Sequence, residues 1–194
     1  MEDRARSFCE ICSAPFGVEI AETANLSMSQ VGVILTDLQS HDLLVMDNSA
    51  SAIVYAYPFA GHPTDHRVEL SGRELYAVCA VDALGVAGMF RKDTTIKSTC
   101  RTCGVRIEIG TARNGKSLSY CRPVGSVVWY DLAYRQTAAE SCCPAIAFLC
   151  SDEHLGQWLL DQNPKRIGCR LTLDEGLEVG RALFEPVLAS ASVR

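Results

Sequence analysis

The chain has 194 residues, of which 48% are hydrophobic and 21% are charged. With a mean hydropathy of +0.09, it is too apolar for an intrinsically disordered protein and long enough for one well-filled core or two small ones. Its 23 acidic and 18 basic side chains give a net charge of -5, which argues against a protein that mainly neutralises phosphates. We therefore expect a globular protein without a nucleic-acid partner.

The chain carries no signal for a membrane or for export. No run approaches the roughly 18 consecutive apolar residues of a transmembrane helix. The charged residues 1–6 lack the apolar stretch that follows them in a signal peptide. We expect no membrane partner and a cytoplasmic location. In a reducing cytoplasm, the 10 cysteines indicate metal binding or catalysis more than disulfides. We therefore expect a function that depends on cysteine thiols.

Residues 1–60 predict a small helical domain that ends in a hairpin. One helix is expected over residues 16–24, and Ser27 or Ser29 can cap a second helix with apolar residues at helical spacing. The hairpin strands are expected over residues 43–46 and 52–57. Helix, turn, helix and hairpin together resemble a winged helix.

The charge of this domain argues against a winged-helix regulator that binds DNA. Residues 1–60 contain two basic side chains and eight acidic ones. A DNA-binding surface requires the opposite balance, because it faces phosphates. We expect a packing or lid module instead.

A second domain is expected over residues 61–194, because the turn-forming residues 61–65 precede a change in sequence character. Ser71 and Glu74 fit the capping-box pattern and predict a helix over the apolar-rich residues 75–90. Strands are expected over residues 94–99, 105–109 and 126–134, a strand or buried segment over 142–150, and helices over 151–160 and 174–189. The fold class expected is α+β, with the winged-helix-like domain packed on a mixed or antiparallel sheet flanked by helices.

Cys79 and Asp82 lie three residues apart on the predicted helix, so a thiol and a carboxyl share one apolar face. Desolvation there disfavours the carboxylate and allows Asp82 to exchange a proton with the thiol. The spacing also fits an ordinary core cysteine beside an aspartate that faces solvent or a helix N-terminus.

Cys142 and Cys143 are adjacent, and neighbouring side chains of an extended backbone point to opposite faces. One thiol can therefore face a site while the other faces the core. Two buried cysteines in a strand fit the pattern equally well.

Two C-x-x-C pairs have the spacing of half a zinc site: Cys9 with Cys12, and Cys100 with Cys103. Together they can form a composite structural zinc site that ties the N-terminal domain to the second one. A dithiol that relays a soft metal, or unrelated cysteines, are the alternatives. The remaining cysteines, Cys121, Cys150 and Cys169, are expected to be packing residues, and the four histidines show no metal-binding spacing.

Three cysteine-bearing segments, in this order, resemble the organomercurial (alkylmercury) lyases. They are residues 73–84, which contain Cys79 and Asp82, residues 98–100, and Ser141-Cys142-Cys143 with the apolar run behind it. The likeness covers roughly residues 50–188, and an N-terminal unit of this kind is also a family trait. The first 60 residues are shorter than in the best-known members, and Cys9, Cys12 and Cys103 lie outside the catalytic pattern.

The resemblance implies protonolysis of a carbon–mercury bond without an organic cofactor. Carried over by position, Cys79, Cys142 and Asp82 are the catalytic residues: two thiolates bind the soft metal, and the carboxyl relays a proton to carbon. The Hg(II) product would stay on these residues until a small thiol or a mercuric reductase takes it. Cys100 is implied to be structural and Cys143 dispensable.

Two other functions remain open on the sequence. One is a non-catalytic protein that binds or senses Hg, Zn or Cu through its thiols. The other is a divergent homologue that acts on another substrate.

Overall fold

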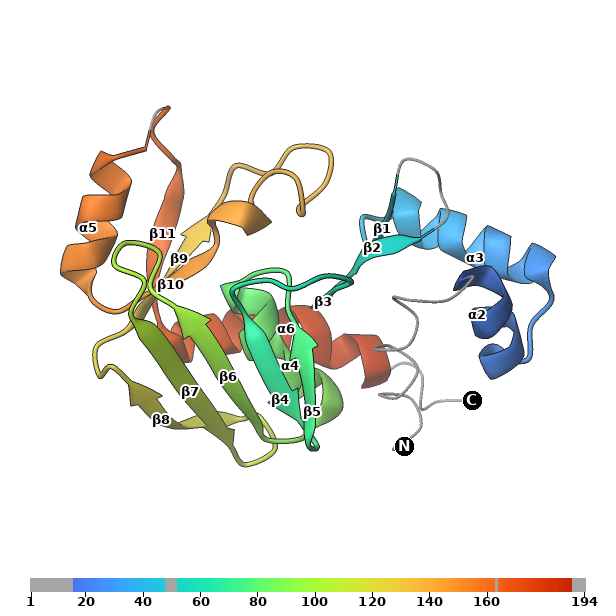
Figure 1. Cartoon of the computed structure of the whole chain (residues 1–194), viewed down its shortest axis with the longest axis horizontal. Helices are drawn as coiled ribbons and strands as arrows, with labels where there is room; N and C mark the ends of the chain where they lie inside the picture. Colours follow the sequence, from blue (N-terminus) through green and yellow to red (C-terminus); the bar gives the residue numbers. More distant parts are fainter. Residues whose placement is uncertain (1–15, 48–51, 163, 190–194) are drawn as a thin grey trace.

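The computed structural model describes residues 16–47, 52–162 and 164–189, and they form an α+β fold with three antiparallel sheets (Figure 1). The helices are α2 (Phe16–Ala24), α3 (Met28–Ser40), α4 (Ala80–Phe90), α5 (Asp152–Leu160) and α6 (Leu173–Ala189), with a 3-10 helix η1 (Cys143–Ala145). The largest sheet has the strand order β5 (Arg73–Tyr76), β4 (Arg67–Leu70), β6 (Thr94–Thr99), β7 (Arg106–Ala112) and β8 (Ser117–Arg122). The second sheet joins β10 (Ala147–Leu149), β9 (Val127–Asp131) and β11 (Gly168–Thr172). The third joins β1 (Leu44–Met46), β2 (Ile53–Ala56) and β3 (Phe59–Ala60). The expected fold class is thus confirmed.

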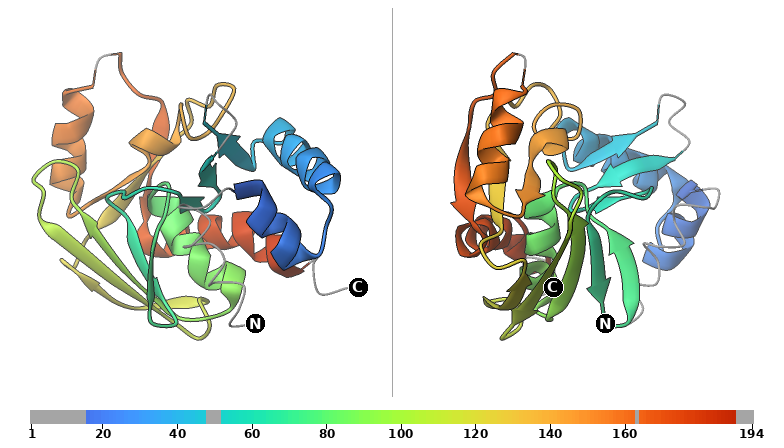
Figure 2. Two further views of the ribbon diagram at one scale, coloured as in Figure 1. Left: turned by 45° about the vertical axis from the view of Figure 1, so that its right-hand side comes forward. Right: turned by 60° about the vertical axis from the view of Figure 1, so that its left-hand side comes forward.

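Helices α2 and α3 and the β1–β2 hairpin lie together at one end of the molecule (Figures 1 and 2). Ser27 caps α3: its Oγ accepts from the backbone N–H of Gln30, and its own N–H donates to Gln30 Oε1 at 2.9 Å. This reciprocal pair satisfies two N–H groups that a helix start leaves free. The predicted order of elements is confirmed, while the likeness to a winged helix and the boundary at residue 60 stay predictions.

The predicted helix over residues 75–90 is wrong in its first turn. Ser71 and Gly72 have φ angles of 52° and 77° and form a two-residue turn between β4 and β5, not a helix cap. Strand β5 then pairs Leu75 with Val68, and both side chains are buried. Burial in the sheet outweighs the local capping-box pattern, so the helix begins only at Ala80.

The other predicted elements of the second domain are found with shifts of at most three residues at their ends. Strands β6, β7 and β9 and helices α5 and α6 occupy the expected places. The segment over residues 142–150 divides into η1 and β10. Among the described residues, no helix has the length and apolar character needed to cross a bilayer.

Helices α4 and α6 pack against each other behind the five-stranded sheet (Figure 1). They touch at two glycines. A methyl group added to Gly180 would lie 2.7 Å from the backbone N of Gly85 and 2.7 Å from the carbonyl O of Val81. The contact fixes α4, whose first turn carries Asp82, against the core.

Gly180→Ala is therefore expected to lower the free energy of unfolding by roughly 1–3 kcal/mol, because the helices must separate to admit the methyl group. Gly32→Ala in α3 is the matched control, since no atom lies within 4 Å of the added methyl group. It should leave stability unchanged or raise it by up to about 1 kcal/mol. Urea denaturation of both variants checks this, and equal stability of Gly180→Ala and wild type would contradict the packing described.

Candidate active site

Cys79 and Asp82 meet at the start of α4. Cys79 is the N-cap residue, with an extended backbone, and its Sγ accepts a hydrogen bond of 3.4 Å from the backbone N–H of Asp82. Both residues are buried, with 1% and 4% of their surface exposed. The expected thiol–carboxyl pair is present, although it occupies a helix end and not the middle of a helix.

The turn that carries Cys142 and Cys143 is hydrogen-bonded to the start of the same helix. The backbone N–H of Ala80 donates to the carbonyl of Ile146 at 3.2 Å, which joins segments far apart in the chain. As a result, the ligand atoms of Cys79, Asp82 and Cys143 all lie within 4.8 Å of one another. Cys142 lies beside this group, and its thiol donates a 3.8 Å hydrogen bond to the carbonyl of Ala138.

The environment separates the protonation states of these four groups. Burial raises the pKa of Asp82 to about 7, and hydrogen bonds from Cys79 oppose this only in part. Its Oδ2 atom is buried and has no hydrogen-bond partner among the described residues. Burial also raises the pKa of the Cys79 thiol.

Cys142 and Cys143 are shifted in opposite directions by the hydrogen bond between them. That bond lowers the pKa of Cys142 to about 7, against the effect of its burial. The Cys143 thiol has its pKa raised far above the usual range by its interactions with the neighbouring sulfurs of Cys142 and Cys79 and by burial. Near neutral pH Cys142 is therefore the thiolate of the cluster, and Cys79 and Cys143 are thiols. The carboxyl of Asp82 exchanges its proton easily.

Residues of the N-terminal part hold the loop that precedes Cys142. The backbone N–H of Ala138 donates to Asp42 Oδ2 at 2.8 Å, and that of Ala139 donates to the Tyr57 hydroxyl oxygen at 2.6 Å. Two consecutive amides are thus satisfied by side chains from a distant part of the sequence. This contact supports the predicted packing or lid role of the N-terminal unit.

Asp42→Ala is expected to cost roughly 1–2 kcal/mol of stability and to loosen the loop, because the Ala138 amide loses its partner. Hydrogen–deuterium exchange should show faster exchange over residues 137–141. Asp37→Ala is the control, since its exposed carboxylate lies against His41, the residue that caps the end of α3. Unchanged exchange in Asp42→Ala would show that this contact does not order the loop.

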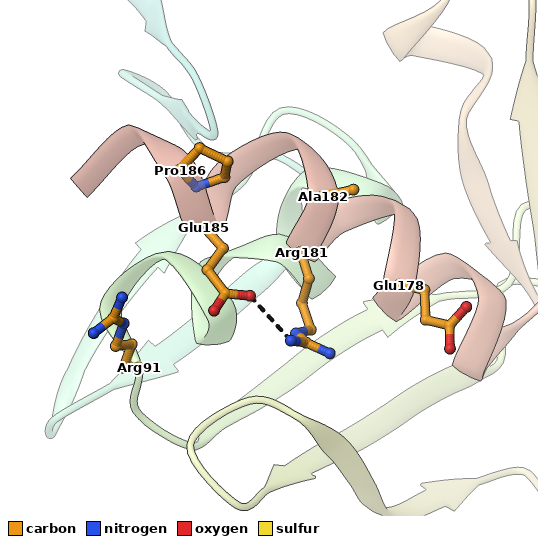
Figure 3. Close-up of a pocket in the computed structure, with 6 residues that line it drawn as sticks. All are labelled: Arg91, Glu178, Arg181, Ala182, Glu185 and Pro186. Atoms are coloured by element: carbon orange, nitrogen blue, oxygen red, sulfur yellow. Dashed lines mark hydrogen bonds and ion pairs between the residues drawn. The ribbon is translucent and has the colours of Figure 1, made fainter. Parts of the chain in front are cut away.

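A surface pocket of about 470 Å³ leads to the cluster. Cys143 and Pro144 line it on one side, and Val78 and Arg101 contribute from other segments. A second pocket, between α6 and the end of α4, is lined by the charged side chains of Arg91, Glu178, Arg181 and Glu185 and contains no thiol (Figure 3). Of these two pockets, the first is the one lined by a residue of the Cys79–Asp82–Cys143 group.

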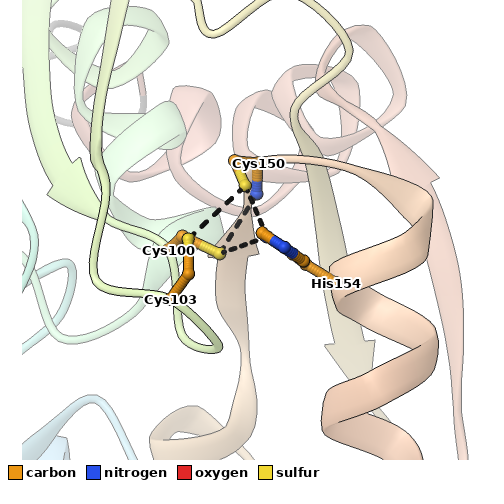
Figure 4. A group of neighbouring side chains, drawn as sticks. All are labelled: Cys100, Cys103, Cys150 and His154. Atoms are coloured by element: carbon orange, nitrogen blue, oxygen red, sulfur yellow. Dashed lines mark hydrogen bonds between the residues drawn. The ribbon is translucent and has the colours of Figure 1, made fainter.

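The structure gathers a second set of possible ligands, of which the sequence predicted Cys100 and Cys103. It missed Cys150, expected only to pack, and His154, for which no metal-binding spacing was seen. Cys100 and Cys103 lie with Cys150 and His154, and the four ligand atoms are within 4.8 Å of one another (Figure 4). The signal was present in the sequence: Cys150-x-x-x-His154 begins a predicted helix. Cys9 and Cys12 of the expected zinc site lie outside the described residues. Of the other two expected packing residues, Cys121 is half-buried, whereas Cys169 is exposed, so the packing role expected of Cys169 is wrong.

Residues 59–185 match the family model described as alkylmercury lyase. The chain belongs to the alkylmercury lyase family. The family predicted from the sequence is thereby confirmed, and with it the expected enzyme class.

Individual alkylmercury lyases are related to this chain at moderate identity. The alkylmercury lyase of Staphylococcus epidermidis is 26% identical over 166 residues, which are 85% of this chain and 72% of that protein. That of Bacillus cereus is 29% identical over 122 residues, which are 62% of this chain and 54% of that protein. The match thus spans about half the length of the Bacillus cereus protein.

A solved structure shares the fold. The crystal structure of the mercury-bound form of MerB2 superposes with a TM-score of 0.75 at 25% identity, and the match covers 93% of this chain and 85% of that one. The likeness therefore extends beyond the residues that the family model matches.

Proposed function

We propose that this protein is an organomercurial lyase that cleaves carbon–mercury bonds by protonolysis and yields a hydrocarbon and Hg(II). One observation carries the proposal: a buried carboxyl with a pKa near 7 lies directly beside buried thiols. Thiolates are the ligands that a soft metal prefers. A carboxyl that exchanges protons near neutral pH can supply the proton that the departing carbon needs.

Capture of the substrate begins at Cys142. Its lowered pKa makes it the thiolate of the group near pH 7, and only the thiolate binds a soft metal well. It displaces the ligand opposite carbon on mercury. Cys143 is a positioning residue in this step, because its thiol donates the hydrogen bond that stabilises the Cys142 thiolate.

Cleavage then uses the Cys79–Asp82 pair. Asp82 takes the proton from the Cys79 thiol, and the new thiolate becomes the second sulfur ligand of mercury. Two sulfur ligands raise the electron density on mercury and weaken its bond to carbon. Asp82 delivers the proton to carbon as that bond breaks, so R–Hg⁺, the Cys142 thiolate and the Cys79 thiol give R–H and a bis-thiolate Hg(II).

The product would remain on Cys79 and Cys142, with Asp82 in contact, until an acceptor removes it. Small thiols or a mercuric reductase are suitable acceptors, because they offer competing sulfur ligands. No organic cofactor takes part in these steps. All eight cysteines in the described part of the chain are free thiols, which supports a reducing, cytoplasmic setting.

Within this scheme residues 61–194 form the catalytic domain, and residues 1–60 form the winged-helix-like module that supports its loop. The contacts of Asp42 and Tyr57 with residues 138 and 139 favour this supporting role of residues 1–60. The acidic charge of residues 1–60 favours a role without nucleic acid.

Incubation of the protein with phenylmercury or methylmercury and excess small thiol tests the proposal. Headspace gas chromatography should detect benzene or methane over many turnovers. Mercury that stays on the protein without hydrocarbon release would instead identify a thiol-based metal-binding protein.

A further inference from the structure

We infer that Cys100, Cys103, Cys150 and His154 form a closed tetrahedral Zn²⁺ site that joins the β6–β7 turn to the end of β10 and the start of α5. The four side chains converge from two segments of the chain (Figure 4). They lie apart from the Cys79–Asp82 group, and the proposed cleavage does not use them.

The separations between the ligand atoms suit a zinc ion. Zinc–sulfur bonds of about 2.3 Å and zinc–nitrogen bonds of about 2.0 Å give tetrahedral edges of about 3.8 Å between sulfurs and about 3.5 Å between sulfur and nitrogen. Cys103 Sγ and Cys150 Sγ are 3.8 Å apart, and Cys100 Sγ lies 3.7 Å from His154 Nδ1. The edge from Cys150 Sγ to His154 Nδ1, at 2.8 Å, is the one that must lengthen.

The backbone holds both halves of the site in place. In the first half, the N–H of Gly104 donates to the carbonyl of Cys100 at 2.8 Å, and Gly104 has a φ of 70°, which closes the tight turn between the two cysteines. In the second half, Ser151 caps α5 and fixes the turn that bears His154.

Two hydrogen bonds then join the halves. The N–H of Cys150 donates to Cys100 Sγ at 3.4 Å, as backbone amides do to metal-bound sulfur, and Thr102 Oγ1 donates to the carbonyl of His154 at 2.8 Å. The C-x2-C spacing of the first half and the Cys₃His ligand set are those of structural zinc sites. Three cysteines and one histidine fill the coordination sphere and leave no position for a substrate.

Elemental analysis of protein purified with a reductant and without a chelator tests the inference. Wild type should contain one zinc per chain. Cys150→Ser should retain less than a tenth of it, and Cys169→Ser, an exposed cysteine in β11, should retain all of it. The double variants Cys9→Ser/Cys12→Ser and Cys79→Ser/Cys142→Ser should also retain it. Zinc-free wild type, or zinc lost with Cys9 and Cys12 but kept in Cys150→Ser, would overturn the inference.

X-ray absorption on the wild-type zinc protein gives a test that needs no variant to fold. Three sulfurs and one nitrogen around zinc are expected. Four sulfurs would overturn the inference in favour of a site that includes Cys9 or Cys12. A disulfide between Cys103 and Cys150 in protein kept under reductant would overturn it as well.

Discussion

Asp82→Asn is expected to bind mercury as wild type does and to release hydrocarbon roughly 10²–10⁴ times more slowly. Asparagine has the size of aspartate but cannot take the proton of Cys79 or hand it to carbon, while the sulfur ligands stay in place. Headspace gas chromatography measures the hydrocarbon, and elemental analysis after gel filtration measures the mercury. Full activity in this variant would exclude Asp82 as the proton relay.

The same variant should be more stable than wild type at alkaline pH. The pKa of Asp82 in the folded protein, about 7, lies above its ordinary value of 3.8, so the folded state holds a proton that the unfolded state has lost. The free energy of unfolding of wild type therefore falls as the pH rises from about 4 to about 7 and stays low above that. Asp82→Asn avoids this loss, on the order of 4 kcal/mol.

Denaturation curves at pH 4.5 and pH 8 check the sign of this effect. The two proteins should be close in stability at pH 4.5, and the variant should be clearly more stable at pH 8. Glu153→Gln is the control, because that carboxylate is exposed at the start of α5. A wild type that is more stable than Asp82→Asn at pH 8 would contradict a raised pKa for this carboxyl.

Cys142→Ser should lose hydrocarbon release at every pH, whereas Cys143→Ala should lose it mainly near neutral pH. Without the Cys143 donor, the pKa of Cys142 moves from about 7 back towards its ordinary value of 9.0. The thiolate fraction at pH 7 then falls, and the rate with it, by roughly tenfold or more. The pH–rate profile of single-turnover cleavage should shift to higher pH and recover near pH 9.

Cys143→Ser is the matched control, because a hydroxyl can still donate to the Cys142 thiolate. Its pH–rate profile should stay close to that of wild type. The competing arrangement has Cys143, which lies nearer to Cys79 and Asp82, as the second sulfur ligand of mercury. In that case Cys143→Ser would abolish cleavage and Cys142→Ser would keep it.

Local patterns predicted the elements whose stability is mostly local. Ser27, one of the two cap residues expected, caps helix α3, and α5 starts within one residue of its expected start, because a helix start depends on neighbouring residues. Ser71 and Glu74 fit the same kind of pattern and failed. Their segment is stabilised more by pairing with β4 and by burial of Leu75 than by a helix cap. This stabilisation depends on residues outside the local pattern.

The same distinction applies to the thiol clusters. Cys79 and Asp82 were paired from their spacing, since a helix start brings residues three apart together. Their proximity to Cys143 depends on the contact between α4 and the turn after η1, which the sequence does not display. The C-x3-H spacing of Cys150 and His154 is visible in the sequence. Their proximity to Cys100 and Cys103 arises only in the folded chain.

The most direct test of protonolysis at this site is a single turnover of phenylmercury in D₂O. Thiol and carboxyl protons exchange with solvent, so the proton that Asp82 delivers to carbon becomes a deuteron. Mass spectrometry should then find benzene with one deuterium, about one molecule per chain, and Hg(II) left on the protein. Undeuterated benzene, or no benzene with phenylmercury still bound, would contradict the account.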